Sequence, residues 1–309
     1  MNQIRVENKL DRPHEGSDSK IHRLIAGKTQ ISAAPLTVPP LHELWTDAWW
    51  GLARSSFFAN LEEQHKLQIL ARCNQSLLTE AYFIEKSGLA YCAKMTLLAE
   101  TTDVAQLYSL IGADEAKHLA WIEPYLVSEL KQLPEGHFLA FLSRLIEDCS
   151  VQSLIYLVQI ILEGWGLDHY QRLSKSCEDA HLAHVFASIL KDEALHHKSG
   201  DLLFDANMLL PGELDQIRHA LETYTDLVRV GPQMVLGVVD EVAGKLSLSD
   251  AIDLLEALQH VEESQRKLSL LKSLMSQPGL ESEVMKLAQE HRFEPLSIET
   301  AAEFFLANR

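Results

Sequence analysis

From Leu41 to the end of the chain, apolar residues recur with helical spacing, and alternating runs of β-branched residues are absent. Residues 1–40 are mostly polar and end in a proline-rich segment, which predicts an N-terminal arm that is extended or partly disordered. The pattern therefore predicts an all-α protein in three parts: the arm (1–40), a helical bundle (41–209) and a C-terminal helical extension packed on the bundle (210–309).

Capping and turn residues predict where the four bundle helices lie. The first helix passes through Glu85 to about residue 98, and Thr101-Thr102-Asp103 is the N-cap signal of the second. Ser150 opens the third, and Glu178 and Asp179 open the fourth. A shorter helix is expected at about 137–147. Three tryptophans are expected to pack the arm onto the bundle: Trp45, Trp49 and Trp50.

The extension beyond Pro211-Gly212 continues as amphipathic helices to about residue 275, with breaks at Gly231-Pro232 and Gly244. Two short segments close the chain, at 280–290 and 297–307. This part contains no metal-ligand pattern, which favours a helical cover or a dimerisation surface.

The third bundle helix is apolar around most of its circumference between Leu154 and Leu162, so it is expected to be buried on all sides. Glu163 follows this run directly. A carboxylate in such a place suffers a heavy desolvation penalty unless a cation meets it. Lysine and arginine are scarce on the facing segments, so a metal ion is the simplest counter-charge.

One short pattern occurs twice, at the same distance behind two matching glutamates. Asp-Glu-Ala-x-His occupies residues 114–118 and 192–196, and the glutamates thirty residues earlier are Glu85 and Glu163. Aligned without a gap, residues 85–118 and 163–196 agree at ten of 34 positions. Ordinary residue frequencies predict roughly two or three agreements. Two other Glu-x-x-His pairs, at residues 62–65 and 178–181, lack a partner glutamate at this distance and are interpreted as a solvated face and a helix start.

The repeated residues form the ligand set with which a four-helix bundle holds two metal ions. Residues three apart share a helix face, so each Glu-x-x-His directs both side chains inward. Glu115 and Glu193 are predicted to bridge the ions, Glu85 and Glu163 to be terminal carboxylates, and the nitrogen ligands are His118 and His196. Mixed carboxylate and imidazole ligation suits iron or manganese, including a mixed Mn/Fe pair, better than structural zinc.

Neighbouring residues leave alternatives open. Asp114 and Asp192 are expected to orient the histidines through their remaining ring nitrogens, or else to be exposed acids beside the inner face. Glu80 competes with Glu85 as a ligand, but the two lie about 140° apart around a helix, and the repeat favours Glu85. His197 and His169 are weaker ligand candidates.

The repeat also contains glycines one turn past two ligands, Gly88 and Gly166, where a missing side chain leaves room for a metal, water or dioxygen. The walls of a substrate pocket are expected one turn from the ligands, with core packing as the alternative fate of these residues. The candidates are Tyr82, Cys92, Tyr156, Tyr170, Phe186 and Gly200.

Composition restricts the partners. The formal net charge of −17 argues against a nucleic-acid partner, because such binding draws on lysine and arginine. No apolar signal core or membrane-spanning run is visible, so a cytoplasmic protein is predicted. The four cysteines form no Cys-x-x-Cys pair, which excludes the usual zinc and rubredoxin-type iron sites. They are predicted to be buried free thiols: Cys73, Cys92, Cys149 and Cys177.

With its paired Glu and Asp-Glu-Ala-x-His motifs, the segment from about 62 to 205 resembles the ferritin-like superfamily of diiron-carboxylate proteins. The resemblance implies a four-helix bundle with a non-haem dimetal centre, without selecting a member. Ile122 stands where ribonucleotide reductase subunits carry the radical tyrosine, and Ile189 where the N-oxygenases carry a further histidine. The absent cysteine pairs remove rubrerythrin's iron–sulfur module.

This resemblance implies an oxidoreductase. The leading hypothesis is an O2-dependent diiron oxidase or oxygenase that hydroxylates, desaturates or otherwise oxidises a small organic substrate through a peroxo species. It would use an external electron donor and could act as a homodimer. The alternatives are a rubrerythrin-like peroxidase or iron-handling protein, and a helical interaction protein with a vestigial site.

Overall fold

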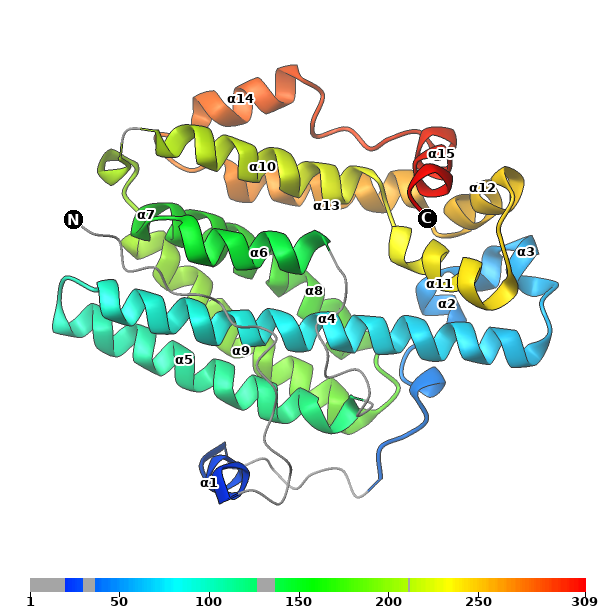
Figure 1. Ribbon diagram of the computed structural model, residues 1–309, viewed down its shortest axis with the longest axis horizontal. Helices are drawn as coiled ribbons and strands as arrows, with labels where there is room; N and C mark the ends of the chain where they lie inside the picture. Colours follow the sequence, from blue (N-terminus) through cyan, green and yellow to red (C-terminus); the bar gives the residue numbers. More distant parts are fainter. Residues whose placement is uncertain (1–19, 30–36, 127–136, 211) are drawn as a thin grey trace.

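The computed structural model describes residues 20–29, 37–126, 137–210 and 212–309, and every regular element in these ranges is helical (Figure 1). The prediction of an all-α protein is therefore confirmed. Among the described helices, none combines the length and the apolar character that crossing a membrane requires.

Four helices of the segment 41–209 carry the predicted ligands: α4 (Glu63–Leu98), α5 (Thr102–Ile122), α8 (Glu163–Ser176) and α9 (Ala180–Leu203). Shorter elements precede or connect them: α1 (Lys20–Thr29), η1 (Leu41–Glu43), α2 (Asp47–Trp50), η2 (Leu52–Arg54), α3 (Ser56–Ala59), η3 (Glu123–Tyr125), α6 (His137–Asp148) and α7 (Val151–Leu154). Helix α1 lies within the segment expected to be extended or disordered; residues 1–19 and 30–36 of that arm lie outside the described ranges.

The C-terminal extension consists of η6 (Ala206–Met208), α10 (Glu213–Arg229), α11 (Gln233–Ala243), α12 (Leu248–Ala257), α13 (His260–Met275), α14 (Glu281–Gln289) and α15 (Ile298–Asn308). The breaks fall at Gly231 and Gly244, both with positive φ, which glycine adopts without steric cost.

Capping side chains fix the starts of α5 and α9. The Thr101 hydroxyl accepts a hydrogen bond from the backbone N–H of Val104, and the Asp179 carboxylate accepts one from Leu182. Each cap satisfies a donor that the first turn of a helix leaves unpaired.

One feature of the third bundle helix was not predicted. Between α7 and α8 the chain winds as a π-helix, η5 (Ile155–Leu162), and Glu163 follows its last residue. π-helical turns are rare and occur frequently at functional sites.

Two helical hairpins form the centre of the molecule. Helices α4 and α5 pack along each other, as do α8 and α9, and α5 joins the hairpins by packing on α9. Trp45 is fully buried and donates from its indole to the carbonyl of Leu173 on α8, while Trp50 donates to Asn74 on α4. The tryptophan segment thus packs onto both hairpins.

The extension forms a second layer and a separate end cluster (Figure 1). Helices α10 and α13 pair with each other, and α13 packs on η5 and α8. Buried tyrosine hydroxyls join the layers, because Tyr224 donates to the carbonyl of Leu157 and Tyr156 donates to that of Met275. Helices α11, α12 and α15 share another apolar core with the start of α4.

The C-terminal residue is held by a buried carboxylate. Asp240 of α11 is 4% exposed and accepts hydrogen bonds from Lys245, Arg309 and the backbone N–H of Leu246. Burial alone would raise the pKa of Asp240, but these donors lower it below its usual value.

Replacing Asp240 by Asn should reduce the free energy of unfolding at pH 7 by about 2 kcal/mol, since hydrogen bonds to a charged group are lost. The pKa of Asp240 is depressed in the folded state. Its contribution to the free energy of unfolding is therefore present above the unfolded pKa of ~3.9 and is lost as the pH falls through the folded-state pKa. Denaturant unfolding at pH 7 and at acid pH measures both effects. The exposed neighbour Glu241, which pairs with Arg72, is the control, and Glu241→Gln should cost less than ~1 kcal/mol. Equal losses for the two variants would contradict the assignment.

Candidate metal centre

Six side chains from four helices meet between the two hairpins. Glu85 comes from α4, Glu115 and His118 from α5, Glu163 from α8, and Glu193 and His196 from α9. They form two groups that share Glu193, and within each group the donor atoms lie within 4.8 Å of one another. The first group comprises Glu85, Glu115, His118 and Glu193, and the second comprises Glu163, Glu193 and His196.

In the first group, Nδ1 of His118 faces three carboxylates. It lies 2.8 Å from Oε2 of Glu85, 3.6 Å from Oε1 of Glu193 and 3.9 Å from Oε2 of Glu115. All four residues are buried, and His118 has no exposed surface. The Glu-x-x-His spacing therefore directs Glu115 and His118 to the same point, as helix geometry requires.

In the second group, Nδ1 of His196 lies 3.4 Å from Oε1 of Glu115 and 3.6 Å from Oε1 of Glu193. Glu115 and Glu193 thus each approach both histidines. Oε2 of Glu163 is buried and accepts no hydrogen bond from the described residues. A buried carboxylate oxygen in that state requires a donor or a cation.

Electrostatics disfavour full ionisation of the four carboxyl groups unless a cation is bound. Burial raises the pKa values of Glu115, Glu163 and Glu193, and neighbouring carboxylates raise them further. Burial lowers the pKa of both histidines, but the facing carboxylates raise it more, to about 9 for His118 and about 10 for His196. Two imidazolium groups offset only part of the charge of four carboxylates.

The donor set fits a metal ion. It offers carboxylate oxygens and imidazole nitrogens, the ligands of hard and borderline divalent cations, in a desolvated position. Both ring nitrogens of His196 also lack a hydrogen bond within the described part of the chain. The buried cluster could therefore hold a metal ion.

The two aspartates of the repeated motif contact the histidines in a crossed arrangement. Asp192 of α9 lies 3.3 Å from Nε2 of His118 on α5, and Asp114 of α5 lies 3.5 Å from Nε2 of His196 on α9. Burial would raise the pKa of Asp114, but the nearby His196 ring and the Lys117 ammonium, which donates a hydrogen bond to it, lower the pKa to about 2. Each aspartate is therefore placed to fix the ring orientation and tautomer of the opposite histidine.

Side chains fill the space beside two of the glycines that the sequence singled out, Gly88 and Gly200. A Cβ on Gly88 would lie 2.5 Å from Oε2 of Glu115, so the missing side chain makes room for a glutamate rather than for water or dioxygen. A Cβ on Gly200 would lie 3.0 Å from Cγ of Gln159, so a side chain fills that space as well. A Cβ on Gly166 would have a single neighbour within 4 Å, a ring carbon of Tyr170 at 4.0 Å, so the expected room is present there.

A buried hydrogen-bond network beside the second group was missed. Gln159 of the π-helix accepts from the hydroxyls of Tyr91 and Tyr108, at 2.9 and 3.0 Å. Its amide donates to the carbonyl of His196 and to the hydroxyl of Ser199, at 2.8 and 2.6 Å. The sequence signal for this network was Gln159, the single amide side chain in an otherwise apolar run, which lies one turn before Glu163.

The residues predicted to wall a substrate pocket have different surroundings. Tyr170 donates from its hydroxyl to Glu85, and its ring stacks on Phe186. Cys92 is buried, and burial together with the nearby Glu163 and Glu193 carboxylates raises the pKa of its thiol. Tyr82 packs edge-on against its neighbour Phe83, and Tyr156 stacks on Phe204, so these two are core residues.

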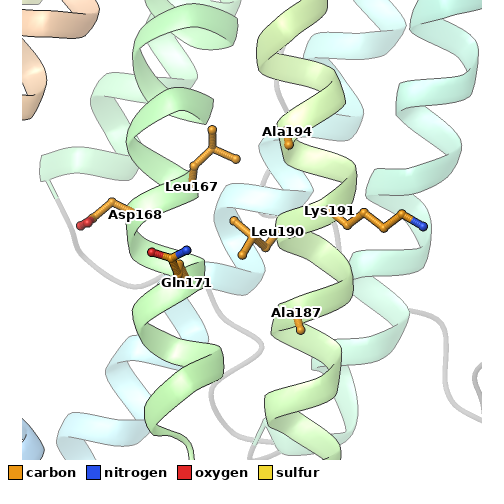
Figure 2. A pocket seen from close by; sticks show the side chains of 7 residues that line it. All are labelled: Leu167, Asp168, Gln171, Ala187, Leu190, Lys191 and Ala194. Atoms are coloured by element: carbon orange, nitrogen blue, oxygen red, sulfur yellow. The ribbon is translucent and has the colours of Figure 1, made fainter.

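A hollow of about 510 Å³ lies at the surface between α8 and α9 (Figure 2). None of the predicted wall residues lines it. Its lining consists of Leu167, Asp168, Gln171, Ala187, Leu190, Lys191 and Ala194.

The weaker ligand candidates remain outside both groups. His197 approaches the carbonyl of Gln159 at 3.3 Å, and Glu80 interacts with Lys267 instead. In the rejected pair at 178–181, His181 contacts the hydroxyl of Tyr125 at 2.8 Å.

Glu163→Gln should abolish metal binding by the second group and, in the metal-free protein, raise the midpoint of thermal unfolding, because it removes a charge whose buried Oε2 has no hydrogen-bond partner. Metal analysis after anaerobic Fe(II) loading and thermal unfolding with chelator measure the two effects. Glu178→Gln, at an exposed position in the rejected pair, should change neither. Unchanged metal content in Glu163→Gln would refute this ligand assignment.

Asp114→Asn and Asp192→Asn should each weaken metal affinity about 10–100-fold, because the opposite histidine loses the carboxylate that orients it. Competition with a metal chelator measures the change. The Asp103→Asn variant, in the exposed first turn of α5, is the matched control. Each aspartate variant is also combined with a variant of each histidine, and metal affinity is measured for the double variants. If Asp114→Asn were non-additive only with a His118 variant, and Asp192→Asn only with a His196 variant, the crossed arrangement would be wrong.

Comparisons of the chain with protein-family models, with curated proteins and with solved structures give no match. The assignment of the centre accordingly depends on the donor atoms of Glu85, Glu115, His118, Glu163, Glu193 and His196 and on their arrangement.

Proposed function

We propose that this protein is an O2-dependent diiron oxidase or oxygenase, built on a ferritin-like four-helix bundle of α4, α5, α8 and α9. The observation that carries the proposal is the pair of donor groups that share Glu193, with Glu115 between the two histidines. One group serves each ion, and the shared carboxylates serve both.

In this proposal, Glu85 and His118 hold one ion, Glu163 and His196 hold the other, and the remaining two glutamates bridge them. Iron is the proposed metal, with manganese or a mixed pair compatible with the same donors. When bound, such a pair of ions supplies electrons to O2 and Lewis acidity at one place.

The chain itself supplies burial and orientation. Apolar helices surround the donors, so water is excluded and charge interactions are strengthened. The crossed aspartates hold the histidine rings, and Gln159 holds the backbone of α9 at His196. For hydroxylation, a substrate C–H bond and O2, with two electrons and two protons from an external donor, give an alcohol and water.

A rubrerythrin-like peroxidase or iron-handling protein is the second candidate. The filled spaces at Gly88 and Gly200 favour it, because a closely packed centre suits a substrate as small as hydrogen peroxide or iron itself. In the peroxidase reaction, hydrogen peroxide would accept two electrons and two protons and give two water molecules.

The Fe(II)-loaded protein should consume O2 faster than it reacts with hydrogen peroxide, and Glu163→Gln should abolish the O2 reaction because one group of donors is incomplete. An oxygen electrode and stopped-flow absorbance measure the two rates. A much faster reaction with hydrogen peroxide would favour the peroxidase. A protein that stays metal-free after anaerobic loading would refute both candidates.

A further inference from the structure

The π-helix η5 sets the direction of Glu163, the carboxylate that follows its last residue. The N–H of Glu163 donates to the carbonyl of Val158, five residues back, whereas in an α-helix it would donate to that of Gln159. The wider turn takes in one extra residue. A return to α-helical winding would therefore turn Glu163 by about 100° around the helix axis, away from the second donor group.

Glu163 depends on this winding because little else orients its side chain. Its Oε2 is buried and accepts no hydrogen bond from the described residues. Glu85, the matching carboxylate of the other half, accepts a hydrogen bond from Tyr170 and lies 2.8 Å from Nδ1 of His118. Side chains thus orient Glu85, whereas the winding of the chain orients Glu163.

His197 of α9 contacts η5 one turn before Glu163. Its Nδ1 lies 3.3 Å from the carbonyl oxygen of Gln159, and since a carbonyl only accepts, Nδ1 is the donor. The side-chain amide of Gln159 in turn donates to the carbonyl of His196 at 2.8 Å. Two successive residues of α9 therefore hold Gln159, one by its main chain and one by its side chain.

The ring of His197 also packs against the backbone directly after Glu163. A Cβ on Gly164 would lie 2.9 Å from Cε1 and 3.1 Å from Nδ1 of His197. Leu274 of α13 approaches the same position, with its Cδ2 at 2.6 Å. A side chain at Gly164 would therefore displace the ring or Leu274, so this glycine is what allows α9 and α13 to come close to the end of the π-helix.

His197 is adjacent to His196 in sequence, but its ring nitrogens face elsewhere. Nδ1 faces the carbonyl of Gln159, and Nε2 lies 3.9 Å from the carboxylate of Asp201. Neither nitrogen belongs to the two donor groups. His197 therefore reaches the centre through the backbone that carries Glu163, and not as a ligand.

The other half of the repeat lacks both these contacts and the π-helix. Ala81 and Leu119 occupy the positions that match Gln159 and His197, and α4 is α-helical throughout its described length. Where apolar residues replace the polar pair, the chain reaches its ligand with ordinary winding. The π-helix and the contacts from α9 thus occur together.

We propose that His197 is a positioning residue for the second metal ion. Its hydrogen bond to Gln159 and its packing on Gly164 keep η5 wound as a π-helix, and this winding directs Glu163 to the second donor group. The first ion does not depend on His197, because its carboxylate, Glu85, is oriented by other side chains. This inference rests on the proposed function, because it assigns a role at the same centre.

Anaerobic cobalt(II) titration of the full-length, metal-free protein tests the inference, by calorimetry and by the visible absorption of the bound ion. The unchanged protein should bind two ions. His197→Leu should bind one as before and the other about 10–100-fold more weakly, as expected when an orienting contact is lost. His197→Asn should restore the second affinity, because its amide N–H can donate to Gln159 from near the position of Nδ1.

Amide hydrogen exchange of the metal-free protein separates the hydrogen bond from simple packing. Exchange within residues 155–164 should be faster in His197→Leu and unchanged in His197→Asn, because the first variant loses the bond and the second keeps it. His184→Leu, at an exposed position of the same helix, is the control and should match the unchanged protein in both measurements.

Unchanged cobalt affinity in His197→Leu would overturn the inference, as would equal weakening of both ions or equal losses in the Leu and Asn variants. Circular dichroism confirms that each variant is folded. Failure of this inference alone leaves two ions bound to the unchanged protein. If the unchanged protein took up no cobalt, the proposed centre itself would be refuted, so the two failures are distinct.

Discussion

The rest of the structure depends on four carboxylates held together in the interior, three of them buried and the fourth, Glu163, half-buried. Carboxylates this close in a poorly solvated interior cannot all be ionised without cations, and two imidazoles supply only part of the opposing charge. Holding such groups together requires rigid elements on every side. Four long helices supply the side chains, and the layer of α6, α10 and α13 closes the apolar surroundings. The apolar enclosure and the charge excess are thus two aspects of one arrangement, because desolvation makes a bound cation more favourable.

Much of this could be predicted from the sequence, because helix geometry converts spacing into direction. The repeat identified the six donors, and the caps at Thr101 and Asp179 located two helix starts. What could not be predicted depends on contacts between helices. The π-helix ending at Glu163, the partners of Gln159 and the crossing of aspartates to the opposite histidines are set by packing that no local pattern records.

The glycines illustrate the same limit. A missing side chain shows that something comes close, but not what comes close. Gly88 receives the carboxylate of Glu115, whereas Gly200 receives the side chain of Gln159. In the other half of the repeat, the positions matching Gly200 and Gln159 are Ile122 and Ala81, so a small residue and a larger one have exchanged places. The core volume is preserved while one half gains a polar network and the other stays apolar.

The crossed pairing of Asp114 with His196 and Asp192 with His118 has a consequence for the origin of the chain. Each half of the repeat carries a histidine but relies on the other half for the carboxylate that orients it. A two-helix unit with this motif would complete its site only by pairing with a second copy about a two-fold axis, as in a symmetric dimer. In such a dimer every mutation appears twice. A single chain is free of that restriction, so matching positions such as Cys92 and Tyr170 can differ.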